Sequence, residues 1–115
     1  SPFINLNYNH MNNQVQLIGN MGIDPEVTNF ESGAKKVRFS LATNEVYTTK
    51  TGDKKQKTQW HNVYAWGPTA SYIAKSGKKG RQLAITGKLR TEKYISKEGK
   101  SRTTTGIEVS RAIAL

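Results

Sequence analysis

The sequence contains no cysteine, few acidic residues and no long apolar run. Without cysteine there is no disulfide framework, no thiolate zinc site and no thiol nucleophile, and nothing indicates an oxidising compartment. No apolar stretch approaches membrane-spanning length and no signal-peptide pattern opens the chain, so we expect a cytoplasmic protein without membrane contacts. Two histidines and scattered carboxylates predict neither a metal site nor a cofactor.

Positive charge is what the chain has in excess. Eighteen lysines and arginines oppose eight aspartates and glutamates, which gives a formal net charge of +10 on 115 residues. Such a field attracts polyanions and speeds their encounter, whether the partner is a nucleic acid or an anionic membrane surface. Charge alone is equally compatible with a basic domain that binds no polyanion, so the arrangement of the other residues decides.

The chain is long enough for one domain. Its first ten residues, Ser1–His10, are rich in asparagine and show no clear period. Because Met11 follows directly, we expect residues 1–10 to be a cloning remnant or an N-terminal extension, with the folded domain spanning residues 11–115.

The segment around the two tryptophans alternates with a period of two. In an extended strand Trp60 and Trp66 share one face with Tyr64, while Val63 and Ala65 point to the opposite face. A strand usually sends its aliphatic residues into the core, so the tryptophans are expected on the outer surface. The alternative is that these rings are ordinary core residues. The lysine-rich residues directly before this strand favour the surface interpretation, because a polyanion would need both rings and charges.

Alternating hydrophobicity predicts five strands and one short helix. The expected strands cover residues 12–22, 35–43, 58–67, 81–90 and 102–109, and the helix covers residues 70–75 after Pro68. The residues expected to point inward are Val37, Phe39 and Leu41 on the second strand, Leu83, Ile85 and Leu89 on the fourth, and Ile107 and Val109 on the fifth. Gly87 is expected where the fourth strand bends.

Two other segments complete this prediction. Residues 44–57 are expected to form a long, flexible hairpin tip, and residues 110–115 to follow the last strand as a short end. Five strands with one helix between the third and fourth is the order of an all-β, five-stranded Greek-key barrel, the OB-fold, whose strand face and loops bind oligonucleotides.

Four segments carry a resemblance to a known family. They are Leu17–Val27, Phe39–Glu45, Thr58–Val63 and Ile85–Thr91. In order and spacing they resemble the signature blocks of the bacterial single-stranded DNA-binding protein family, and the similarity extends from Met11 to Leu115. The resemblance implies an OB-fold that assembles as a homotetramer, or as a dimer in some relatives. It also implies coating of single-stranded DNA, without strong sequence preference, during replication, recombination and repair, and hence a nucleoid-associated location.

The resemblance further implies which residues contact DNA. The family's base-stacking positions fall on Tyr47, Trp60, Trp66 and Tyr94. Two of the four are tyrosine where well-known members carry tryptophan, so weaker stacking is expected there. The basic residues in matching strand or loop positions, expected to contact phosphates, are Lys36, Arg38, Lys50, Lys54, Lys55, Lys57, Lys88, Arg90, Lys93 and Arg102.

Family members typically add a flexible linker and an acidic tail that recruits replication and repair enzymes, and the printed sequence has neither. Such partners are therefore expected only if the full protein carries a tail. A protein-interaction module of replication restart, built on the same fold, is the alternative; a tight dimer with modest DNA affinity would favour it. RNA binding also stays open, because stacking alone does not distinguish RNA from DNA.

An enzyme, in particular a nuclease, is the alternative from another class. Metal-dependent hydrolysis needs clustered carboxylates, whereas the acidic residues here are scattered over strands and loops. The segment Gly99-Lys100-Ser101 resembles the end of a phosphate-binding P-loop, but Tyr94 stands where the first glycine is required. His61 lies opposite the tryptophans and is expected to be a structural or subunit-interface group. No catalytic residue is therefore expected.

Overall fold

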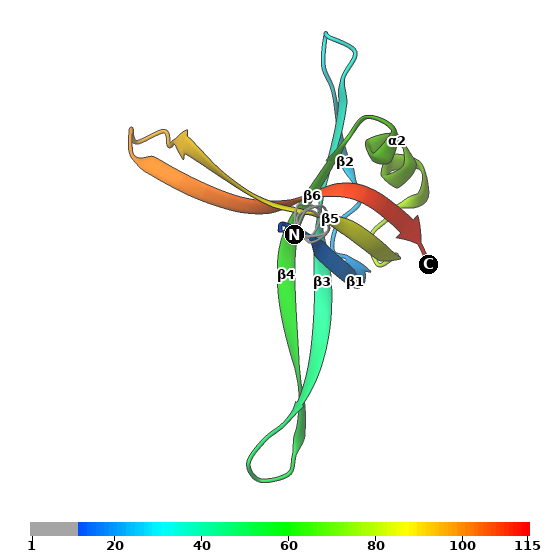
Figure 1. Cartoon of the computed structure of the whole chain (residues 1–115), viewed down its shortest axis with the longest axis vertical. Coiled ribbons are helices and arrows are strands. Elements are labelled where there is room, and N and C mark those ends of the chain that lie inside the picture. Colours follow the sequence, from blue (N-terminus) through cyan, green and yellow to red (C-terminus); the bar gives the residue numbers. More distant parts are fainter. Residues whose placement is uncertain (1–11) are drawn as a thin grey trace, which may run out of the picture.

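A computed structural model describes residues 12–115. The predictions made for residues 1–10 and for Met11 lie outside these described residues. Along the described chain the elements follow in the order β1 (Val15–Met21), β2 (Glu26–Asn29), β3 (Lys35–Thr48), β4 (Lys54–Trp66), α2 (Gly67–Ser76), β5 (Gln82–Ile95) and β6 (Ser101–Ala114) (Figure 1).

The strands form one sheet that closes on itself. The strand order is β1-β5-β6-β4-β3-β2, and β1 also pairs with β3, so five strands close a barrel. The β4–β6 pair is parallel, whereas β1–β5, β3–β4 and β5–β6 are antiparallel. This is the predicted OB-fold, with α2 between the third and fourth barrel strands as expected. The short strand β2 was not predicted as a separate strand, and it pairs with β3 beside the barrel.

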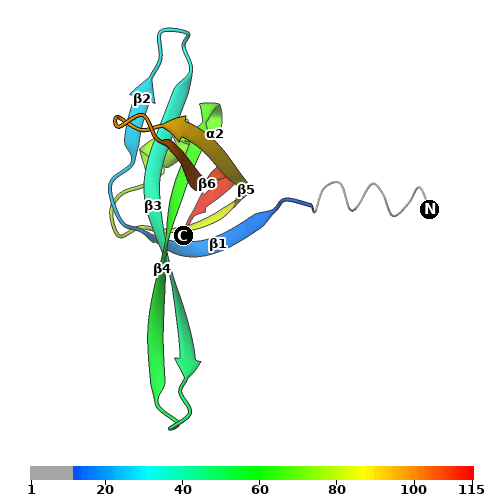
Figure 2. The same ribbon diagram turned by 90° about the vertical axis from the view of Figure 1, so that its left-hand side faces the viewer.

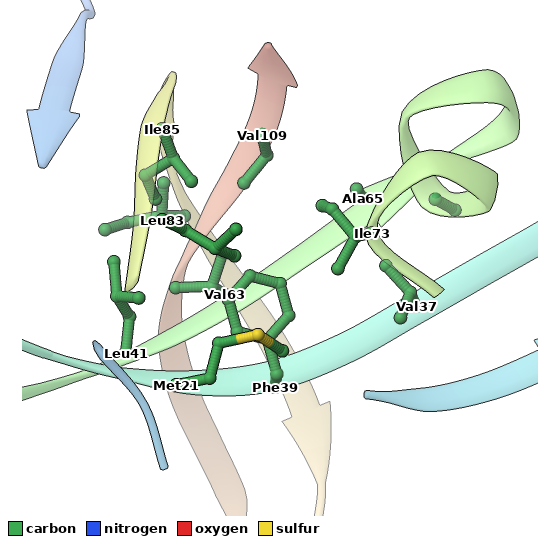
Figure 3. Packing of buried hydrophobic residues seen from close by; sticks show 12 residues of the cluster. Met21, Val37, Phe39, Leu41, Val63, Ala65, Ile73, Leu83, Ile85 and Val109 are labelled. Atoms are coloured by element: carbon green, nitrogen blue, oxygen red, sulfur yellow. The ribbon is translucent and has the colours of Figure 1, made fainter. Parts of the chain in front are cut away.

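The core fills the barrel with apolar residues, most of which alternation assigned to it. Val37, Phe39 and Leu41 of β3 are buried, and so are Val63 and Ala65 of β4 (Figure 3). The rest of the buried cluster consists of Met21, Ala70, Ile73, Leu83, Ile85, Ile107 and Val109. Helix α2 contributes Ile73 and Ala70, which tie the helix to the strands. The predicted inward positions are thus confirmed, with one exception on β5.

That exception is Leu89, which is 50% exposed rather than buried. The pairing of β5 with β6 shifts register between Thr86 and Gly87, as expected for a bend at this glycine. A Cβ at Gly87 would collide with the backbone carbonyl of Glu108, so only glycine fits. The pairing of β1 with β5 ends at Gly87, and past this glycine β5 and β6 continue as a two-stranded ribbon (Figure 1). Leu89 therefore lies beyond the part of β5 that β1 covers, although Ile107 opposite it is still buried.

Two hairpins are longer than predicted. The β3–β4 ladder continues to the pair Thr48 and Lys54, so the segment predicted as a flexible tip is a two-stranded arm with a short turn (Figure 2). In that turn the amide of Thr49 donates to the carbonyl of Asp53 at 2.8 Å. Strand β6 runs to Ala114, which pairs with Leu83, so the prediction that the last strand ends near residue 109 was also wrong. In both segments cross-strand hydrogen bonds extend the ladder past the point where hydrophobic alternation stops.

Candidate nucleic-acid interface

The aromatic side chains of β4 point away from the core. Trp60 is 64% exposed and Trp66 is 42% exposed, whereas Val63 and Ala65 between them have no exposed surface. The side chains of β4 therefore alternate between the outer surface and the core as predicted, and the interpretation of these tryptophans as core residues is wrong. The outward face of β4 is a row of rings on a rigid strand.

Trp60 is supported from below by the chain after β1. A Cβ added to Gly22 would collide with the Trp60 ring, which therefore lies directly against this glycine. The amide of Gly22 donates to the carbonyl of Ser40 at 2.9 Å, which fixes that backbone beside β3. Because most of the ring remains exposed, Trp60 offers a supported surface on which a planar group can stack.

Trp66 belongs to a small aromatic and cationic cluster. The Phe30 ring stacks on it, with 5.7 Å between ring centroids and 30° between the ring planes. The Nζ atom of Lys36 lies 5.3 Å from the centroid of the Trp66 ring and 5.0 Å from that of Tyr64. Strand pairing creates this cluster, because Lys36 lies directly opposite Trp66.

Sequence reasoning missed Phe30. The turn that follows it returns the chain to β3, and the amide of Phe30 donates to the carbonyl of Ala34 at 2.9 Å. The pairing of β2 with β3 was needed to place the ring beside Trp66. The feature of the sequence that could have indicated a role for Phe30 is an aromatic residue directly before a turn.

A shallow groove of about 340 Å³ lies beside these rings, between β3, β4, β5 and β6. Its lining includes the rings of Tyr64 and Trp66 and the cations Lys36, Arg38 and Arg90. These residues come from three strands far apart in the sequence. The arrangement combines planar apolar surfaces with positive charge, which suits an unstacked polyanionic strand.

The same outward face continues along the β5–β6 ribbon. Tyr64 of β4 lies opposite Glu108 of β6, and Glu108 lies opposite Lys88 of β5. Residues that lie opposite each other point to the same face of the sheet, so the Lys88 side chain is on the outward face that carries the groove. Alternate residues further along the ribbon share that face. They are Arg90, which lies opposite Gly106, Glu92, which lies opposite Thr104, and Tyr94, which lies opposite Arg102.

The structure does not bring every predicted residue to this face. On the β3–β4 arm Tyr47 lies opposite Lys55, and together with Lys57 they follow the face of His61 rather than that of Trp60. Lys54 follows the face of Trp60, and Lys50 lies in the turn of the arm. On the other ribbon Lys93 shares the face of Leu89. Tyr47 and Tyr94 are both exposed but belong to different arms.

The groove also contains acidic residues that sequence reasoning did not place there. Arg38 forms an ion pair with Glu26, with 2.9 Å between Nη2 and Oε2. Arg90 forms a longer pair with Glu108, at 3.6 Å. Burial raises the pKa of Tyr64 above its usual value, Glu108 and Glu92 raise it further, and Arg90 opposes them. The Tyr64 hydroxyl therefore keeps its proton at neutral pH.

His61 lies on the inner side of β4, where its Nε2 atom is 2.9 Å from the hydroxyl of Thr43. A partly buried histidine with a hydrogen-bond partner is what a structural role requires. Within residues 12–115 no group of three or more histidine, aspartate or glutamate side chains is arranged to hold a metal ion. Over the same residues, no helix has both the length and the apolarity needed to cross a bilayer.

A closed five-stranded barrel with an aromatic and basic outer face defines the class: an OB-fold protein with a surface of the oligonucleotide-binding type. The family follows from sequence comparison. The family model described as "Single-strand binding protein family" matches residues 12–115, and the chain belongs to this family. Its members are binding proteins, so the chain is not an enzyme.

Two curated relatives carry the name single-stranded DNA-binding protein 1. The one from Xylella fastidiosa is 41% identical over 96 residues, which are 83% of this chain and 71% of that protein. The one from Chlorobaculum tepidum is 42% identical over 82 residues, which are 71% of this chain and 51% of that protein. The matched part thus spans about half of one relative and about seven tenths of the other.

Solved structures show the same fold. A Plasmodium falciparum SSB in complex with ssDNA superposes with a TM-score of 0.81 at 32% identity, covering 90% of this chain and 94% of that one. A deletion mutant of the single-stranded DNA-binding protein from Thermus aquaticus gives a TM-score of 0.79 at 22% identity, covering 90% and 50%. The second likeness concerns the fold alone.

Proposed function

We propose that the chain binds single-stranded DNA without strong sequence preference, and coats and protects it during replication, recombination and repair. One observation carries the proposal: the rings of Trp60, Tyr64 and Trp66 share an outer face with the cations Lys36 and Arg90. Membership of the single-strand binding protein family supports it, as does the fold shared with an SSB solved with ssDNA.

The two kinds of residue have different tasks in this mechanism. Every base has a π-face, so rings hold bases without reading sequence, at about 1–3 kcal/mol per stacked base. Lysine and arginine neutralise phosphates and release counterions, which gives a salt slope of about −0.7 per phosphate for a single strand. Duplex DNA hides its base faces, so the rings favour the single strand.

We assign base stacking to Trp60 and Trp66 beside the groove and to Tyr47 and Tyr94 on the two arms. Phosphate contacts are assigned to the basic residues of the groove and both arms. These are Lys36, Arg38, Lys50, Lys54, Lys55, Lys57, Lys88, Arg90, Lys93 and Arg102. Because Tyr47 and Tyr94 lie on separate arms, a bound strand would run from one arm across the groove to the other, and it would pass to the opposite face of the β3–β4 arm to reach Tyr47. The exposure of both tyrosines supports this path.

The test is a titration of tryptophan fluorescence with oligo-dT and with a matched duplex, each at low and high salt. Strong quenching by the single strand alone is expected, because the exposed Trp60 and Trp66 rings would stack on bases. Salt-sensitive binding without quenching would contradict stacking and leave only a basic surface. Equal affinity for oligo-rU would extend the ligand class to RNA.

The proposal includes a homo-oligomer, with a tetramer ahead of a dimer. An apolar surface away from the groove supports it: Ile18 and Ile113 are more than half exposed and line a hollow over β1, β5 and β6. A cytoplasmic, nucleoid-associated location follows from the proposed ligand. Recruitment of replication and repair proteins is proposed only for a longer form that carries an acidic tail.

A further inference from the structure

Carboxylates lie among the cations of the groove. Glu92 and Glu108 line it beside Arg90, and Glu26 reaches Arg38 from β2. Strand pairing determines the position of two of these carboxylates. Glu26 of β2 lies directly opposite Arg38 of β3. Arg90 of β5 lies opposite Gly106 of β6, and Glu108 is two residues further along β6 on the same face. A surface that binds a polyanion gains nothing from negative charge, so these carboxylates need another explanation.

Both groove arginines already have acidic partners before a strand arrives. The pair between Arg38 and Glu26 is short, at 2.9 Å, and the pair between Arg90 and Glu108 is looser, at 3.6 Å. Besides its burial, the proximity of Glu108 and Glu92 raises the pKa of Tyr64, as local negative charge would. The positive charge of these two groove arginines is thus largely neutralised.

Solvent can reach both pairs. The side chains of Arg38 and Glu26 are 64% and 57% exposed, and those of Arg90 and Glu108 are 46% and 35% exposed. Exposed pairs are weak, so a phosphate can replace the carboxylate. Each displaced carboxylate then lies near the bound phosphate without its arginine and attracts a cation from solution. Because this uptake offsets a cation released from the DNA, the net release of counterions is smaller.

We propose that Glu26 and Glu108 are competitor groups, which hold Arg38 and Arg90 until strand phosphates displace them and so limit both the affinity and the salt dependence of the groove. The inference rests on the proposed function. It assigns the net electrostatic attraction mainly to the arms, where many lysines lie, and leaves the centre to the rings. A strand would then be held in the centre mainly by stacking and be released there readily.

The test compares Glu26→Gln, Glu108→Gln and the double variant with Asp24→Asn, a control with the same charge change. The Asp24 carboxylate lies off both arms and accepts a hydrogen bond from the Lys79 amide. Affinity for oligo-dT is measured over a range of NaCl concentrations. Each groove variant is expected to bind oligo-dT about two- to five-fold more tightly at low salt. This factor corresponds to the free energy of a weak, exposed ion pair that the strand no longer has to break. Each should also steepen the salt slope by up to about 0.7.

Two results would overturn the inference. If the wild type binds oligo-dT but both groove variants match Asp24→Asn in slope and affinity, the carboxylates do not compete with phosphate. If the groove variants bind more weakly, the carboxylates help to hold the strand, for example by accepting hydrogen bonds from bases. Absence of binding by the wild type would refute the proposed function itself, and this inference with it.

Discussion

At the scale of single residues, the exposed rings and the cations of the outward face make separable contributions to DNA binding. Trp60→Ala is expected to weaken binding by about 1–3 kcal/mol with little change in salt slope, because stacking releases few counterions. Lys88→Ala is expected to reduce the slope by about 0.7, because one phosphate contact is lost. The measurement is oligo-dT affinity against NaCl concentration, with Lys78→Ala, in the loop after α2, as the control. Equal slope changes in both variants would contradict this division.

Phe30 supports the second tryptophan. Its ring stacks on Trp66, so Phe30→Ala should leave Trp66 less ordered and weaken oligo-dT binding, although Phe30 is 43% exposed and adds little to the core. Val27→Ala is a matched control, because Val27 lies on β2 with the same 43% exposure. Binding and thermal unfolding should be measured for both. If Phe30→Ala binds like Val27→Ala, Phe30 has no role in binding.

At the scale of elements, the bulge in β5 sets where the second ribbon leaves the barrel. Gly87→Ala is expected to destabilise the fold by roughly 1–3 kcal/mol, because its Cβ would collide with the Glu108 carbonyl. Gly106→Ala is the control on β6, where the nearest atom to an added Cβ is 3.4 Å away. Urea unfolding measures both. Equal stability of the two variants would show that the strands can move apart at Gly87.

The β3–β4 arm carries several charged residues and contributes no buried residue to the core. Its lysines Lys54, Lys55 and Lys57 are exposed, and the buried residues of both strands lie nearer the barrel. Replacing the three lysines by glutamine should leave the melting temperature nearly unchanged and reduce the salt slope of oligo-dT binding by up to about 2, at about 0.7 per phosphate contact. An unchanged slope would mean that the strand does not follow this arm.

At the scale of the whole molecule, the apolar surface over β1, β5 and β6 is the expected contact between copies. Ile18→Asp should lower the mass measured by light scattering, because a buried carboxylate disfavours association. Stability of the single chain should change little, since Ile18 is 60% exposed. Val27→Asp on β2 is the control. If Ile18→Asp keeps the wild-type mass, the copies meet elsewhere or not at all.

Much of the barrel could be predicted from local pattern. Alternation assigned Val37 and Phe39 to the core and Trp60 to the surface, because side chains along a strand alternate wherever the strand lies. Leu89 was assigned wrongly, because its exposure depends on a ribbon that leaves the barrel beyond the bulge. The arms were underestimated, because polar strands held by a hydrogen-bonded ladder show no hydrophobic alternation.

The candidate site was only partly predictable for the same reason. The sequence pointed to Trp66 and Lys36 separately, but their approach depends on the β3–β4 register. It gave no indication that Glu108 lies beside Arg90, since that contact depends on the pairing of β5 with β6. Phe30 likewise required the pairing of β2.

By itself, the sequence determined the excess of positive charge, the order of strands and helix, the faces of each strand and the resemblance to a family. These properties follow from composition and from neighbours a few residues apart. The tertiary structure alone decided which cations share the groove, which carboxylates neutralise them and which aromatic rings the two arms separate. Those properties depend on pairs such as Tyr64 with Glu108, which the pairing of β4 with β6 brings together from distant parts of the sequence.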